Sequence, residues 1–146
     1  YNVMTNSPGF KSHIRRLKKL LDPDRLEDFN SVKNLPGGFD PTSRFIKAFY
    51  LTKMHVKPNN YREALAYSYN ILSAMALPNG FIRNKKFNYN TYTRYICLYD
   101  SKHKLLTVRT DTNPMVYELS FEDIKEEDKR QAFFLETDFV TEKLNQ

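Results

Sequence analysis

The 146-residue chain has a mass of 17.3 kDa, which excludes a large multidomain enzyme and favours one domain. Hydrophobic residues make up 40% of it, too many for a fully disordered chain, and no apolar run is long enough to span a bilayer. The net charge is +6, but residues 1–100 carry 16 basic and 7 acidic groups, whereas residues 101–146 carry 7 and 10. Such a basic first part permits nucleic-acid binding. However, no zinc-finger, basic-zipper or RNP-like pattern is present, and basic residues beside apolar ones are typical of a solvated helix face.

The first part of the chain predicts one strand end followed by three helices. Residues 3–5 match the end of a strand, and Ser7-Pro8 is typical of a helix start, because serine caps free N–H groups and proline tolerates the first helical position. The expected apolar stripe of this helix consists of Phe10, Ile14, Leu17 and Leu21. The sequence 22–24 breaks the helix, and residues 35–38 predict a turn that uses the backbone freedom of two glycines. Further helices are expected over residues 41–55 and 61–75.

The second part predicts strands. A short strand is expected at residues 81–83, a longer β-branched and aromatic one at 91–99, and two more at 104–110 and 115–119. Short turns between the last three indicate an antiparallel meander. The acidic tail from Phe121 is compatible with a helix to about Leu135. Helices followed by strands indicate an α+β fold.

Asn6 is the first candidate for chemistry, because it lies where the expected strand end leads into a helix. A carboxamide held at such a junction can donate hydrogen bonds to an oxyanion. The simpler alternative is that its side chain bonds to the backbone of the turn. Composition alone favours this second interpretation.

Arg44 is the second candidate. It lies in the first turn of the expected helix over residues 41–55, where the helix dipole disfavours a positive charge. Such a charge is often held by a specific partner, and the alternative is an ordinary surface arginine. The sequence leaves these two interpretations about even.

Other reactive residues carry a weaker signal. His13, His55 and His103 do not have metal-ligand spacing, so we expect no metal site and surface or core roles for them. The single cysteine, Cys97, excludes an internal disulfide and falls in an expected strand, so we interpret it as a core thiol. The acidic residues of 122–128 have helical spacing and indicate a solvated face. No phosphate-binding glycine motif is present, and no cofactor is expected.

Four segments together resemble the choloylglycine hydrolase family, which contains conjugated bile acid hydrolases and penicillin V acylases. They are Val-Met-Thr-Asn-Ser-Pro (3–8), Leu-Pro-Gly-Gly-Phe-Asp-Pro-Thr-Ser-Arg-Phe (35–45), Asn-Ile-Leu-Ser (70–73) and Tyr-Thr-Arg-Tyr-Ile-Cys (92–97). His13 also fits the family pattern after the Asn-Ser-Pro turn. The resemblance covers residues 1 to about 119.

The resemblance implies the C-terminal portion of a four-layer αββα N-terminal-nucleophile (Ntn) hydrolase fold with antiparallel sheets. In this family an N-terminal cysteine attacks a linear amide and its own α-amine is the base. By match with the motifs, Asn6 is an oxyanion donor and Arg44 supports the nucleophile electrostatically. We therefore expect residues 1–146 to be a single partial domain of an amidase, without the half that bears the nucleophile.

The sequence also departs from the family pattern. Tyr1 cannot replace a cysteine nucleophile, and Cys97 is internal, so the nucleophile is expected in an N-terminal half that would be a partner of this chain. Gly38 stands where many members have aspartate, and residues 19–34 are shorter than the family's segment, which contributes to subunit contacts in several members. The shorter segment puts formation of a tetramer in doubt, whereas a homo-oligomer stays compatible with the family.

The leading hypothesis is thus a cysteine-nucleophile hydrolase of N-acyl amides such as conjugated bile acids or penicillin V. The chain alone is expected to be inactive and to leave one sheet face uncovered. The alternative is a non-catalytic remnant or an interaction module with the same half-fold. Neither nucleic acid nor a membrane is expected as a partner, and a cytoplasmic location is favoured.

Overall fold

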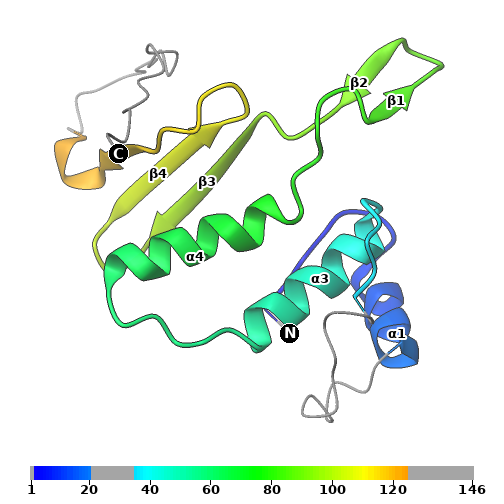
Figure 1. Cartoon of the computed structure of the whole chain (residues 1–146), viewed down its shortest axis with the longest axis horizontal. Helices are drawn as coiled ribbons and strands as arrows, with labels where there is room; N and C mark the ends of the chain where they lie inside the picture. Colours follow the sequence, from blue (N-terminus) through cyan, green and yellow to red (C-terminus); the bar gives the residue numbers. More distant parts are fainter. Residues whose placement is uncertain (1, 21–34, 125–146) are drawn as a thin grey trace, which may run out of the picture. The chain divides into compact units, whose positions relative to one another are not determined.

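The computed structural model describes residues 2–20 and 35–124 of the chain (Figure 1). Helices precede strands along the sequence, which confirms the predicted α+β class. The chain divides into two compact units, Tyr1–Leu77 and Pro78–Gln146, and each is described by itself. The expectation of one domain across residues 1–146 therefore stays a prediction.

The first unit contains helices α1 (Phe10–Leu20), α3 (Pro41–Lys53) and α4 (Tyr61–Ser73) (Figure 1). Helix α1 begins later than Ser7-Pro8 predicted, because the carbonyl of Gly9 accepts the first helical hydrogen bonds, from the amides of Ser12 and His13. The strand expected at residues 3–5 is not formed within the described residues. A strand requires a hydrogen-bonded neighbour, and this segment has none in the described part of the chain.

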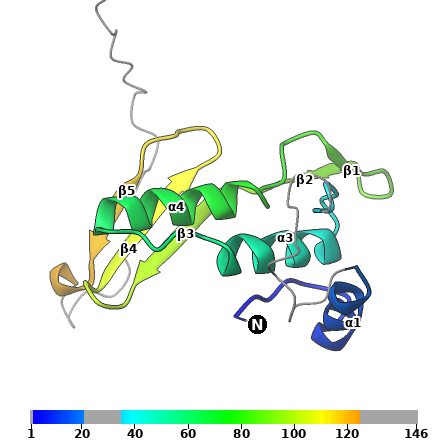
Figure 2. The same ribbon diagram turned by 60° about the horizontal axis from the view of Figure 1, so that its bottom comes forward.

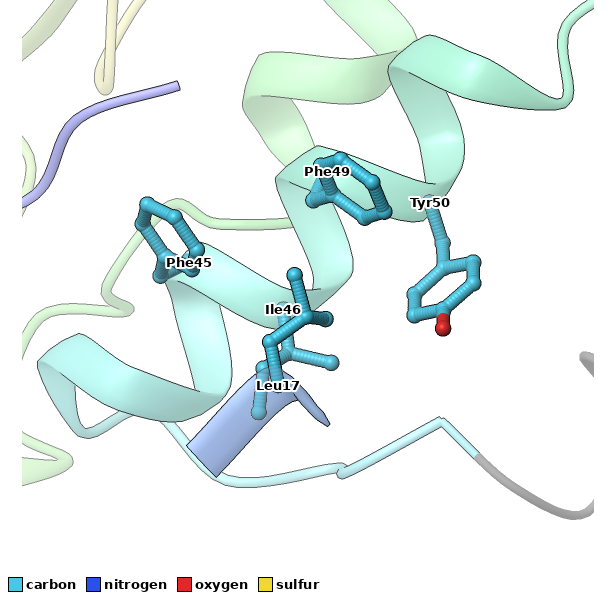
Figure 3. Close-up of a cluster of buried hydrophobic side chains, with 5 residues drawn as sticks. All are labelled: Leu17, Phe45, Ile46, Phe49 and Tyr50. Atoms are coloured by element: carbon cyan, nitrogen blue, oxygen red, sulfur yellow. The ribbon is translucent and has the colours of Figure 1, made fainter. Parts of the chain in front are cut away.

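The core of this unit lies between α1 and α3. Leu17 of α1 packs against four side chains of α3, and all five are at most 3% exposed (Figure 3): Leu17, Phe45, Ile46, Phe49 and Tyr50. Of the stripe predicted for α1, Leu17 is buried and Ile14 is half-buried. Phe10 is 48% exposed, and its ring forms a T-shaped pair with that of Phe45, at 5.9 Å between centroids. Leu21 and the breaker at residues 22–24 lie outside the described residues.

Helix α3 begins at Pro41, as predicted, because Asp40 caps it. One carboxylate oxygen of Asp40 accepts from the amides of Thr42 at 3.0 Å and Ser43 at 3.1 Å, and the other accepts from the Ser43 hydroxyl. The side-chain hydrogen bond from Ser43 is the main cause that lowers the pKa of Asp40 below its ordinary value of 3.8. The carboxylate thus satisfies free N–H groups at the positive end of the helix.

The turn before this cap uses its glycines differently from the prediction. Neither Gly37 nor Gly38 has a positive φ, so neither position needs the left-handed freedom of glycine. A Cβ added to Gly38, however, would lie 2.9 Å from Oδ2 of Asp40 and 2.9 Å from Oγ of Ser43. The requirement at Gly38 is therefore space for the cap.

Helix α4 is fixed to α3 by two polar contacts. Lys47 of α3 donates from Nζ to the carbonyl of Ala74 at the end of α4, at 3.0 Å, and Tyr67 of α4 donates to the carbonyl of Leu51 at 2.7 Å. At its start, Asn60 accepts from the amide of Glu63 at 2.9 Å, as an N-cap. These contacts hold the two helices that border the site described below.

The second unit contains two antiparallel sheets. Strands β1 (Ile82–Asn84) and β2 (Tyr89–Thr91) form a hairpin, and β3 (Tyr95–Asp100), β4 (Leu105–Thr110) and β5 (Tyr117–Ser120) form a meander (Figure 2). The meander confirms the prediction. The single strand expected over residues 91–99 is wrong, because the chain changes partners there: Thr91 pairs with β1, whereas Tyr95 begins the pairing with β4.

The two faces of the meander differ in exposure. In β3, Ile96 is 9% exposed and lies on one face, whereas Tyr95 and Tyr99 on the other face are 64% and 59% exposed. Cys97 shares the face of the two tyrosines because strand side chains alternate. It is exposed, so its interpretation as a core thiol is wrong.

After β5 the structure shows a short 3₁₀-helix, η2 (Phe121–Asp123), where Ser120 caps the amide of Glu122 at 3.2 Å. The rest of the expected tail helix lies outside the described residues. Across the described ranges, no helix has the length and apolar character required to cross a bilayer.

Candidate active site

Asn6 and Arg44 form a hydrogen bond, although they are 38 residues apart in the sequence. Nη2 of Arg44 donates to Oδ1 of Asn6 at 2.9 Å. A guanidinium has no acceptor atom, so the atom of Asn6 that faces it must be the oxygen. The amide nitrogen, Nδ2, consequently points its two N–H groups elsewhere. Of the two interpretations of Arg44, this contact matches the one with a specific partner.

The main chain beside Asn6 is tied to the start of α3. The hydroxyl of Thr5 donates to the carbonyl of Pro41 at 3.0 Å, which links the segment before α1 to the first turn of α3. Arg44 lies one turn further along α3, so the same helix anchors Thr5 and presents the guanidinium to Asn6. The simpler interpretation of Asn6 was a hydrogen bond from its side chain to the backbone of the turn. The structure shows no such hydrogen bond within the described residues.

Both side chains border a pocket of about 370 Å³ inside the first unit. Its walls come from the segment before α1, from α3 and from α4, and they combine polar side chains, among them Asn6 and Arg44, with apolar ones. The apolar lining includes Ala48, Ile71, Leu72 and Met75. We call this the site pocket. Such a combination of apolar walls with a few convergent polar groups is typical of small-molecule sites.

Arg44 gives the site pocket a positive character. It is the charged residue of the pocket lining, and none of the described lining residues is acidic. Its Nε is buried and finds no hydrogen-bond partner among the described residues. The effect of its charge is visible at Lys47, whose pKa is lowered mainly by desolvation and additionally by Arg44. The same field would favour an anion in the pocket.

The three histidines have separate environments. His13 is buried beside the Asn6 main chain, whereas His55 and His103 are exposed. Nδ1 of His55 contacts the carbonyl of Thr52 at 2.7 Å, and Nδ1 of His103 contacts Oδ2 of Asp100 at 2.6 Å, which lowers the pKa of Asp100. No cluster of three or more histidine, cysteine or acidic side chains suited to a metal occurs in residues 2–20 and 35–124.

The sequence predicted no role at this site for two residues that contribute to it, Thr5 and His13. Oγ1 of Thr5 lies 3.1 Å from Nε2 of His13. Nε2 of His13 also contacts the main-chain carbonyl of Asn6, and Thr5 donates to the carbonyl of Pro41 at the start of α3. The only signal in the sequence was the place of His13 one turn after Phe10 in the Asn-Ser-Pro pattern. The position of this single histidine on a helix that is otherwise basic gave no further indication of its contact with Asn6.

Comparison with known proteins agrees with the motif pattern. The sequence model of "Linear amide C-N hydrolases, choloylglycine hydrolase family" matches residues 1–130. A conjugated bile acid hydrolase of Lactobacillus gasseri is 29% identical over 138 residues, covering 77% of this chain and 44% of the relative. A bile salt hydrolase/transferase of Clostridium perfringens is 28% identical over 113 residues, covering 66% of this chain and 34% of the relative.

Solved structures show the same fold. A penicillin V acylase from Agrobacterium tumefaciens superposes with a TM-score of 0.68 and 23% identity, over 85% of this chain and 37% of its own. A mutant conjugated bile acid hydrolase from Clostridium perfringens superposes with a TM-score of 0.72 and 19% identity, over 97% of this chain and 48% of its own. The chain thus spans less than half of each of these relatives. With the family match over residues 1–130, these findings show that the chain belongs to the choloylglycine hydrolase family of linear amide C–N hydrolases.

Proposed function

We propose that this chain forms part of a hydrolase that cleaves the amide C–N bond of N-acyl substrates, of the type represented by conjugated bile acids and penicillin V. The observation that carries the proposal is the hydrogen bond from Arg44 to Oδ1 of Asn6 in the wall of the site pocket. In the proposed site, Asn6 is the oxyanion donor and Arg44 supports the nucleophile. Membership of the family indicates the type of reaction, and the site pocket is where we propose that the reaction takes place.

Asn6 suits an oxyanion donor because its orientation is fixed by the contact with Arg44. With Oδ1 occupied, Nδ2 is the end that can donate to an oxygen which gains charge in the tetrahedral intermediate. The Arg44 charge also polarises the amide, since the acceptor oxygen faces a cation. A donor that is oriented before the reaction stabilises the transition state without reorganisation at the moment of reaction.

Arg44 suits electrostatic support of a thiolate. The pocket lining is free of carboxylates in the described residues, and a guanidinium next to a thiol lowers the pKa of the thiol. In the proposed reaction the sulfur attacks the amide carbon, a C–S bond forms, and the carbonyl electron pair moves to the oxygen held by Asn6. The C–N bond then breaks, and the amine leaves with a proton from the α-ammonium of the nucleophile, while the acyl group stays on the sulfur as a thioester. Water, which gives a proton to the α-amine, attacks the thioester carbon, the C–S bond breaks, and the free acid leaves with the thiolate regenerated.

We further propose that an N-terminal half of the same enzyme supplies the nucleophile and packs on this chain. Two observations support this. The chain matches only 44% of the length of the Lactobacillus gasseri relative, and one face of the β3–β4–β5 meander exposes Tyr95, Cys97 and Tyr99. Large apolar patches on a sheet face are typical of surfaces that another element covers. The small-molecule substrate would then bind between this half and the site pocket.

The test uses the protein produced from its complete natural coding sequence, including any codons upstream of Tyr1. Hydrolysis of glycine-conjugated bile acids and of penicillin V is measured by release of the amine or of the phenoxyacetate. Asn6→Ala should lower kcat by about a hundredfold or more, the usual effect of losing one oxyanion donor. Asn90→Ala, at an exposed position of β2, is the matched control and should retain activity.

An unchanged kcat in Asn6→Ala would remove Asn6 from the mechanism. If the complete protein hydrolyses no N-acyl amide at all, the non-catalytic alternative with the same half-fold is correct. Activity of the 146-residue chain alone that survives Cys97→Ala would contradict the proposed N-terminal nucleophile.

A further inference from the structure

His13 is a buried polar side chain next to the proposed oxyanion donor. Only 1% of it is exposed, and its ring stacks on Phe45 with 5.0 Å between centroids and 10° between planes. Its Nε2 lies 2.9 Å from the main-chain carbonyl oxygen of Asn6 and 3.1 Å from Oγ1 of Thr5. Burial of an imidazole beside an aromatic ring costs free energy unless its nitrogens form hydrogen bonds. The contacts of Nε2 therefore indicate what this buried histidine does.

The hydrogen-bond partners determine where the proton of His13 lies. The Asn6 carbonyl can only accept, so Nε2 must carry a hydrogen. The Thr5 hydroxyl gives its own hydrogen to the carbonyl of Pro41 and can therefore also accept from Nε2. Nδ1 is buried and meets no donor or acceptor among the described residues. A hydrogen on Nδ1 would be buried without an acceptor, which leaves the neutral ring with its hydrogen on Nε2.

We propose that His13, as this neutral Nε2–H tautomer, is a positioning residue for the reaction, and the proposal rests on the proposed role of Asn6. His13 fixes the main chain of Asn6, and Arg44 fixes its side-chain oxygen. The two anchors come from different helices, α1 and α3, and act on different ends of one residue. Together they leave Nδ2 as the group that can donate to the substrate oxygen.

The stack on Phe45 makes this anchor rigid. Phe45 is fully buried in the core between α1 and α3, so the imidazole plane is set by the packed core. Thr5 completes the link, because it contacts His13 and the start of α3 simultaneously. The position of Asn6 is thus tied to the same helix that carries Arg44, which keeps the donor and its guanidinium partner in register.

The test compares two replacements of His13 in the protein from the complete coding sequence. His13→Phe keeps an aromatic ring for the stack but removes the donor, whereas His13→Gln places an amide N–H near the position of Nε2. We expect His13→Phe to lower kcat about tenfold with little change in KM, the loss of one oriented hydrogen bond. His13→Gln should recover most of this loss, and His55→Phe, at an exposed position, should be without effect.

A second measurement is independent of activity. Nitrogen NMR of the histidine-labelled protein, with signals assigned by the single variants, reports which ring nitrogen of His13 carries hydrogen. We expect the hydrogen on Nε2 alone at neutral pH. If His13→Phe does not fold, this spectrum still tests the tautomer, and the kcat of His13→Gln, expected to stay close to that of the wild type, still tests the positioning role. Hydrogen on Nδ1, or equal kcat in the Phe and wild-type proteins, would overturn the proposal. If Asn6→Ala retains activity while His13 shows the expected tautomer, the proposed function fails and the structural anchor stands.

Discussion

A double-mutant cycle between Arg44 and Asn6 tests whether their contact orients the carboxamide. The perturbations are Arg44→Leu, Asn6→Ala and both together, in the protein from the complete coding sequence. A hydrogen bond to a charged group contributes about 1.5–3 kcal/mol when it is well formed. At 2.9 Å the geometry is good, but Asn6 is exposed and Arg44 is only half-buried, so solvent screens the pair. We therefore expect a coupling of about 1 kcal/mol in the free energy of unfolding.

The assay is urea denaturation of the four proteins, with Arg62→Leu as the matched control. Arg62 is exposed at the start of α4, and its replacement should change the free energy of unfolding by less than about 0.5 kcal/mol. Arg44→Lys keeps the charge but not the planar fork, so it should recover only part of the coupling. A coupling below about 0.3 kcal/mol, the usual limit of additivity, would refute the idea that Arg44 holds Asn6.

Three further predictions follow from the cap of α3 and from the meander. Gly38→Ala should lower the free energy of unfolding by about 1 kcal/mol, because its Cβ would displace the Asp40 cap. Gly37→Ala, whose Cβ meets nothing within 4 Å, is the control and should leave the free energy of unfolding unchanged. Equal effects of the two substitutions in urea denaturation would contradict this prediction. The folded-state pKa of Asp40 is lowered, so its stabilisation is present above about pH 4 and is lost as the pH falls through the folded value. Asp40→Ala should therefore cost about 0.5–2 kcal/mol at pH 7 and clearly less at pH 3, and a pH-independent cost in urea denaturation would refute the assignment. In the complete native protein, a thiol reagent should label Cys97 slowly, as followed by peptide mapping, and quickly after denaturation. Fast labelling of the native protein would argue against the proposal that another part of the enzyme covers the face of the meander that carries Cys97.

Local sequence signals predicted much of the fold. Asp40-Pro41 defined the start of α3 because an N-cap carboxylate and a proline at the first helical position act on neighbouring backbone groups. The meander was predictable for the same reason, since β-branched residues and short turns are local features. The predicted start of α1 at Ser7-Pro8 was too early, because Ser7, Pro8 and Gly9 are all acceptable residues before a helix. The start depends on which carbonyl accepts the first helical hydrogen bonds, and this is the carbonyl of Gly9.

Non-local choices could not be predicted. The division of residues 91–99 depends on which strand pairs with Thr91 and which with Tyr95, and a propensity scale contains no information on partners. The exposure of Cys97 follows from the face that β3 turns outward, which periodicity alone cannot assign to core or solvent. The role of Gly38 is similar, since only the folded turn brings the place of a Cβ at this position close to the cap.

The sequence by itself determined the family and the identity of the two candidate site residues, because motifs in order and spacing are properties of the chain. Only the tertiary structure decided that Asn6 and Arg44 touch, that the oxygen of Asn6 faces the guanidinium, and that His13 holds the main chain beside them. The reason is physical. A hydrogen bond across 38 residues depends on how α1 packs on α3, and that packing is set by buried side chains such as Leu17 and Phe45, which lie outside the site itself.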